Sequence, residues 1–167
     1  MNLLGLGLAP DAPGRGIVMI SVAMHAAFFV IVAADAAGLS GAEPAAAVIS
    51  LLWFAAALGV WTAAFARAVV RSTRGDEIAV ASLFFLQGSA PRAIRTRLLG
   101  IAAVVLVVTS VTVVVNPLGF LVNMLPIGFA GLWGARYGVY SERTDPRYTG
   151  RTDGRYRQRT NQGRGSG

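Results

Sequence analysis

Three long runs without a charged residue constrain this chain more than any other feature of its sequence. Residues 16–34 form a run of 19, residues 44–66 a run of 23 and residues 98–135 a run of 38. A helix needs about 20 apolar residues to cross the hydrocarbon core of a bilayer, which is about 30 Å thick. The runs therefore predict membrane-spanning helices, and the longest run is long enough for two of them.

The composition agrees with this interpretation. Of the 167 residues, 54% are hydrophobic and only 14% are charged, and the mean hydropathy is +0.58. A soluble domain has about 25% charged residues, so this chain has too few to cover a water-exposed surface. The chain has no Cys, which excludes disulfides, Cys-ligated metals and thiol catalysis.

The longest run divides at Asn116-Pro117-Leu118-Gly119, which is a turn signal. Proline restricts the residue before it and lacks the N–H that a helix interior requires. An unpaired strand in lipid leaves its backbone amides unsatisfied, so each spanning segment must be helical. We therefore predict an all-α, integral membrane four-helix bundle in a domain covering residues 1–140. The predicted spans are residues 16–38, 44–70, 91–115 and 118–139.

A fifth, shorter helix is predicted at residues 77–87, between the second and third spans. Asp76 is suited to the N-cap, and Gly88 and Pro91 are stop signals. Eleven residues extend only about 16 Å as a helix and do not cross a bilayer. The sequence leaves three placements open: in the membrane interface, as a re-entrant turn, or packed against the cytoplasmic ends of the spans.

Arginine is distributed unevenly among the loops, and this predicts the orientation. The segment between the second and third spans and the C-terminal side are rich in Arg, whereas residues 35–43 and 116–119 contain none. Cytoplasmic loops contain the excess of positive charge, so we predict a plasma-membrane protein with both termini in the cytoplasm. The candidate contacts with anionic lipid headgroups are Arg67, Arg71, Arg74, Arg92, Arg95 and Arg97. An aromatic belt at the same interface is predicted from Trp61, Trp133, Tyr137 and Tyr140.

His25 is the only His and lies at the midpoint of the first predicted span. An ionisable residue at this depth is a functional candidate. The other interpretation is a structural role, in which neighbouring helices supply its hydrogen-bond partners. The sequence offers Thr62, Thr109 and Ser110 as partners and leaves proton relay and ligand contact as alternatives. It contains no second His for a metal site and no convergent catalytic set, so we expect no enzyme activity, metal or cofactor.

Small residues recur at the spacing that lets helices approach closely. One set is Ala55, Gly59 and Ala63, and another is the pair Gly134 and Gly138. Such sets serve internal packing, pairing with a second copy or contact with a protein partner. Pro126 in the fourth span is either a tolerated kink or part of a transport path.

The C-terminal residues 141–167 change abruptly in composition. They contain seven Arg and three acidic residues, few apolar residues and a degraded repeat of eight residues that begins RTDPRYTG at Arg143. We predict a disordered cytoplasmic tail that is solvated, lies on anionic lipid or contacts acidic proteins. Binding of nucleic acid, with Tyr and Arg as stacking groups, is a further alternative, but we do not expect nucleic acid as a partner.

Two segments carry a resemblance to known proteins. Residues 71–97, RSTRGDEIAVASLFFLQGSAPRAIRTR, and residues 131–138, GLWGARYG, resemble a group of small multi-pass membrane proteins of unassigned function from GC-rich Gram-positive bacteria. The resemblance implies a plasma-membrane protein without a known cofactor and assigns no functional residue. We expect an accessory or scaffold subunit without catalytic activity. The alternative is a transporter or channel component that uses the region around His25 and Pro126.

Overall fold

A computed structural model describes residue 9 and residues 11–142. This part of the chain is all-α and has no β-strand. Its elements are α1 (Arg15–Ala36), α2 (Ala42–Thr73), α3 (Val80–Phe84), α4 (Arg92–Val111), the 3-10 helix η1 (Pro117–Asn123) and α5 (Met124–Tyr137). Four segments are long and apolar enough to cross a membrane: α1, α2, α4 and η1 together with α5. The prediction of an all-α chain with four such segments is confirmed.

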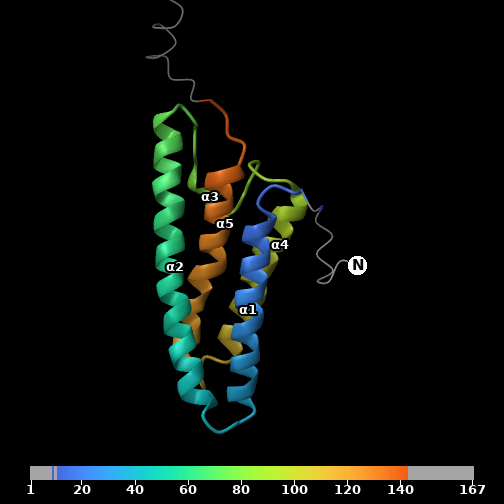
Figure 1. Cartoon of the computed structure of the whole chain (residues 1–167), viewed down its shortest axis with the longest axis vertical. Helices are drawn as coiled ribbons and strands as arrows, with labels where there is room; N and C mark the ends of the chain where they lie inside the picture. Colours follow the sequence, from blue (N-terminus) through green and yellow to red (C-terminus); the bar gives the residue numbers. More distant parts are fainter. Residues whose placement is uncertain (1–8, 10, 143–167) are drawn as a thin grey trace, which may run out of the picture.

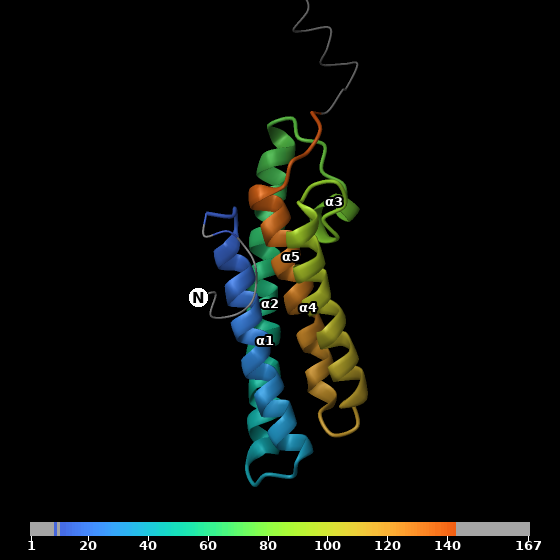
Figure 2. The ribbon, with the colours of Figure 1, turned by 90° about the vertical axis from the view of Figure 1, so that its right-hand side faces the viewer.

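The four long segments run side by side, and each is antiparallel to the next (Figures 1 and 2). The start of α1, the end of α2, α3, the start of α4 and the end of α5 lie together at one end of the molecule. The turns at residues 37–41 and 112–116 lie at the opposite end. We call the first the Arg-rich end and the second the turn end.

Helix α5 packs against α1, α2, α3 and α4 and is the most buried of the spans. Its glycines allow this close approach. A Cβ atom on Gly134 would lie 2.5 Å from the backbone oxygen of Leu83, and a Cβ on Gly131 would overlap the ring of Phe84. The small residues of α5 therefore serve packing within the chain. By contrast, Gly59 on α2 is exposed, and a Cβ there would meet no other atom.

The outer faces of α1, α2 and α4 are apolar. Val30, Leu52, Phe65 and Val107 are each about half exposed or more. Monomeric proteins in water rarely expose contiguous apolar patches of this extent.

Most helix ends lie within three residues of the predicted spans, but the end of α4 and the α-helical start of the last span differ more. Helix α4 ends at Val111 rather than at residue 115, because the chain turns where the Thr112 hydroxyl donates to the Val108 oxygen and Asn116 caps η1. The last span begins as the 3-10 helix η1 and becomes α-helical only at Met124. Pro126 then occupies the third position of α5, where the backbone needs no N–H donor. If residues 122–126 were α-helical, the Pro126 ring would clash with the Val122 carbonyl.

The short helix also differs: residues 77–87 were predicted, and the structure has only Val80–Phe84. Asp76 does not cap it, because its carboxylate pairs with Arg71 instead. Leu83 and Phe84 are buried and pack with Ala68 of α2 and Ala135 of α5. Of the three placements that the sequence leaves open, the structure has α3 packed against the ends of the long helices.

Candidate functional site

His25 lies on the buried face of α1, together with Val18, Ser21, Phe28 and Val32. Its side chain is 1% exposed. Its Nδ1 atom lies 2.6 Å from the backbone oxygen of Ser21. Because a carbonyl oxygen only accepts, Nδ1 donates, and Nε2 is the acceptor of the neutral ring. Nε2 is buried and has no hydrogen-bond partner within the described residues.

The predicted partners of His25 are wrong. The Thr62 hydroxyl donates to the Leu58 oxygen, the Thr109 hydroxyl donates to the Val105 oxygen, and Ser110 is exposed. Ser and Thr in a helix readily donate to the carbonyl one turn earlier, which removes them as donors to a neighbouring helix. The hydroxyl nearest to the ring is that of Ser21 on the same helix, whose Oγ lies 3.5 Å from Nδ1.

Two polar pairs, one buried and one partly buried, join neighbouring segments. The Asn116 amide donates to Ser50 Oγ at 3.3 Å, and the Asn123 amide donates to Thr109 Oγ1 at 2.8 Å. The first pair joins the turn before η1 to α2, and the second joins η1 to α4. Our sequence analysis missed both pairs, although an Asn inside a charge-free run is a signal for an interhelical hydrogen bond.

Charge is concentrated at the Arg-rich end. It contains all eight arginines of the described chain: Arg15, Arg67, Arg71, Arg74, Arg92, Arg95, Arg97 and Arg136. Four carboxylates accompany them: Asp11, Asp76, Glu77 and Glu142. The turn end has two carboxylates, Asp35 and Glu43, and none of these arginines. Counted over the described residues, the net charge is therefore +4 at one end and −2 at the other.

Arg71 differs from the other five predicted lipid contacts because its guanidinium group is used inside the protein. Nε donates to Asp76 Oδ2 at 2.6 Å, and Nη1 donates to the backbone oxygen of Gly138 at 2.9 Å and to that of Ala135 at 3.4 Å. The guanidinium also lies over the ring of Tyr140, 4.8 Å from its centroid. These contacts provide hydrogen-bond donors for backbone carbonyls at the end of α5, and they join α5 to α2.

Among the remaining five, Arg67, Arg74, Arg92 and Arg95 are exposed. Arg97 is half-buried, and its Nη1 is shielded from solvent without a hydrogen-bond partner in the described chain. Their contact with anionic lipid stays a prediction.

Further backbone contacts connect the segments at this end. The Glu77 N–H donates to the Ser141 oxygen at 2.9 Å, and the Val139 N–H donates to the Ser89 oxygen at 3.0 Å. Asp76 and Glu142 form an isolated antiparallel bridge. Two residues of the predicted tail are thus paired with the segment after α2, and residues 143–167 lie outside the described residues.

The four aromatic residues of the predicted belt differ in exposure: Trp133 is buried, whereas Trp61, Tyr137 and Tyr140 are half-buried, and the belt stays a prediction. Trp133 is 2% exposed, and its indole N–H donates to the Pro13 oxygen at 3.1 Å. Trp61 stacks on Phe84 with ring centroids 4.3 Å apart. Burial raises the pKa of Tyr140 above its usual value of about 10, an effect that the Arg71 charge and Ser89 oppose.

The described residues contain no group of three His, Cys, Asp or Glu side chains arranged to hold a metal ion. The chain matches no protein-family model, no curated protein and no solved structure.

Proposed function

We propose that the chain is an integral membrane protein with four spanning helices, located in the plasma membrane with both termini in the cytoplasm. The observation that carries this proposal is the distribution of arginine: all eight arginines of the described residues lie at one end of the molecule and none at the turn end. Positive residues in short loops stay on the cytoplasmic side. The apolar outer faces between the two ends supply the surface that lipid would cover.

We infer that its role is that of an accessory or scaffold subunit without catalytic activity. The polar groups inside the bundle support this role because they are dispersed. Asn116 is bonded to Ser50, Asn123 is bonded to Thr109, and His25 is bonded only to a residue of its own helix. An active site needs several polar groups that converge on one point. The partners we propose are anionic lipid headgroups together with a protein partner or a second copy, and not nucleic acid.

A second candidate function is favoured by one observation, the buried and unpartnered Nε2 of His25. An intramembrane ionisable group without a partner is suited to proton or ligand transfer. In this alternative the chain is a transporter or channel component, and the region of Pro126, where η1 gives way to α5, contributes to the path.

Reporter fusions test the proposed topology. A fluorescent protein that folds only in the cytoplasm is fused after Gly75 or after Gly167, and alkaline phosphatase, active only outside, is fused after Gly38. We expect all three reporters to be active and each exchanged reporter to be inactive. Activity of the phosphatase after Gly167, or release of the chain from membranes by alkaline carbonate, would contradict the proposal.

A flux measurement separates the two roles. The full chain is reconstituted into vesicles that contain a pH-sensitive dye, beside a His25→Leu variant. For an accessory subunit we expect no proton flux above that of empty vesicles in either sample. Flux through the unmodified protein that the His25→Leu variant abolishes would favour transport and overturn the accessory role.

A further inference from the structure

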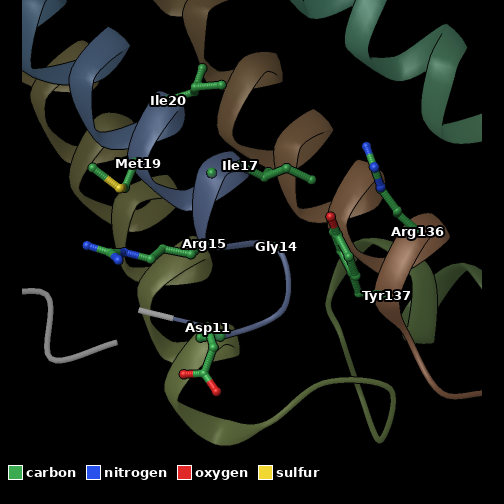
Figure 3. A pocket seen from close by; sticks show the side chains of 10 residues that line it. Asp11, Gly14, Arg15, Ile17, Met19, Ile20, Arg136 and Tyr137 are labelled. Atoms are coloured by element: carbon green, nitrogen blue, oxygen red, sulfur yellow. The ribbon is translucent and has the colours of Figure 1, made fainter. Parts of the chain in front are cut away.

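A cleft of about 740 Å³ opens at the Arg-rich end, between the start of α1 and the end of α5 (Figure 3). Asp11 and Gly14 line it from the loop before α1, and Tyr137 lines it from α5. Its apolar part includes Met19 and Ile20 of α1, which are 37% and 54% exposed. The described residues therefore leave part of this apolar surface uncovered.

The loop that leads into α1 is fixed at the edge of the cleft. The Trp133 indole donates to the Pro13 oxygen at 3.1 Å, and a Cβ atom on Gly14 would overlap the same indole. Ala12 lines the cleft, and its N–H donates to the Ala9 oxygen at 3.0 Å, which closes a turn. The chain before Ala9 therefore starts beside the cleft and does not continue straight on from the end of α1.

The sequence that precedes this loop is apolar. Residues 3–8 are Leu-Leu-Gly-Leu-Gly-Leu and include no charged side chain. In an extended chain, alternate side chains lie on the same side, so Leu4, Leu6 and Leu8 share one side and the two glycines share the other. Six extended residues span about 20 Å, whereas the first five residues of α1 rise only about 8 Å. The segment is therefore long enough to reach across the apolar part of the cleft.

We propose that residues 3–8 dock in this cleft, with their leucines against Met19 and Ile20. The occupant is a segment of this chain because the turn at Ala9 holds its attachment point beside the cleft. A tethered segment has a local concentration in the millimolar range, which favours it over a free apolar partner. Docking closes the cleft and adds a further contact where α1 meets α5. Because the contact lies within one chain, it does not depend on the membrane orientation proposed above.

A single introduced Cys reports whether the cleft is covered, because the chain has no Cys of its own. Gly16→Cys is a suitable reporter, since Gly16 lines the cleft and a Cβ atom there meets no other atom within 4 Å. The rate of its reaction with a water-soluble maleimide is measured on the full chain in nanodiscs. A second reporter, Thr73→Cys, lies exposed at the same end of the molecule but outside the cleft.

The docking segment is changed in two matched ways. The test variant replaces the three alternate leucines by Ser, and the control replaces the two glycines between them, Gly5→Ser with Gly7→Ser. We expect the leucine variant to accelerate the reaction of the Gly16→Cys reporter at least about five-fold, and the glycine control to change it by less than about two-fold. The Thr73→Cys reporter should react at the same rate in both. If the triple variant fails to fold, Leu6→Ser alone replaces it, and carbonate extraction of each variant detects a failure of membrane insertion separately.

Equal reaction rates of the Gly16→Cys reporter with and without the leucines would overturn the proposal. Two patterns of that kind identify another occupant. Protection that is unaffected by the leucine variant but lost on transfer to lipid-free detergent would indicate a lipid chain in the cleft. Protection that falls on dilution of the protein would indicate a second copy.

Discussion

Replacing Arg71 with Lys tests whether this residue contributes to stability through its guanidinium geometry or only through its charge. Lys retains the positive charge, but its three N–H donors are on a single nitrogen, which cannot occupy the positions of both Nε, the donor to Asp76, and Nη1, the donor to Gly138 and Ala135. The ion pair itself contributes little, about 0.2–1 kcal/mol, because both side chains are 27% exposed. A hydrogen bond from a charged donor contributes about 1.5–3 kcal/mol.

Because Lys can still make one of these contacts, we expect Arg71→Lys to lower the free energy of unfolding by about 2 kcal/mol. The matched control is Arg67→Lys, one helical turn earlier on α2. Arg67 is exposed and has no hydrogen bond or ion pair within the described chain. We expect the control to change the stability by less than about 0.5 kcal/mol.

Stability is measured by equilibrium unfolding of the purified protein in mixed micelles, with SDS as the denaturant and tryptophan fluorescence as the signal. Hydrogen exchange gives a local measurement at the Glu77 and Val139 amides, whose bonds to Ser141 and Ser89 lie beside Arg71. A loss of about 2 kcal/mol corresponds to roughly 30-fold faster exchange there. If Arg71→Lys behaves like Arg67→Lys in both measurements, the contacts of Arg71 do not stabilise this end of the protein and our argument is refuted.

Three further predictions use the same unfolding measurement. Gly134→Ala should lower stability by about 2–3 kcal/mol, because the new Cβ meets the α3 backbone, whereas Gly59→Ala should leave it unchanged or raise it by up to about 1 kcal/mol. Asn116→Ala should lower it by about 1–2 kcal/mol by removing the bond to Ser50 and the cap of η1; an unchanged stability would show that neither contact matters. The raised pKa of Tyr140 means that the folded protein favours the neutral phenol. Its contribution is therefore complete below pH of about 10 and is lost as the pH rises further, and Tyr140→Phe should reduce this alkaline loss.

The number of long helices could be predicted because it depends on a local property. A charge-free run of sufficient length indicates a span whatever it packs against, and the Asn116-Pro117 turn divided the longest run correctly. The helix ends were less predictable, because side chains from other segments determine them. Asp76 has the position of an N-cap for α3, but Arg71 on the preceding helix binds its carboxylate and α3 begins only at Val80.

The contacts of His25 and Trp133 could not be predicted for a related reason. A helix surrounded by lipid is apolar on its inner and outer faces alike, so the sequence does not indicate how the helix is rotated about its axis. The depth of His25 could be read from the sequence, but its neighbours could not.

The arginines at one end of this chain therefore have two separable roles, which depend on different properties of the side chain. Orientation in a membrane depends on the number of positive residues in the short loops, which Lys supplies as well as Arg. The junction of α2 with α5 depends on a planar group with several donors, which Arg71 provides through hydrogen bonds to one carboxylate and two backbone oxygens. Within lipid, the helices gain little from burying apolar surface against each other, so close packing and hydrogen bonds must hold them together. Gly131 and Gly134 allow the first, and Arg71, Asn116 and Asn123 supply the second. A variant in which Lys replaces Arg71 should therefore keep its orientation while its Arg-rich end loosens.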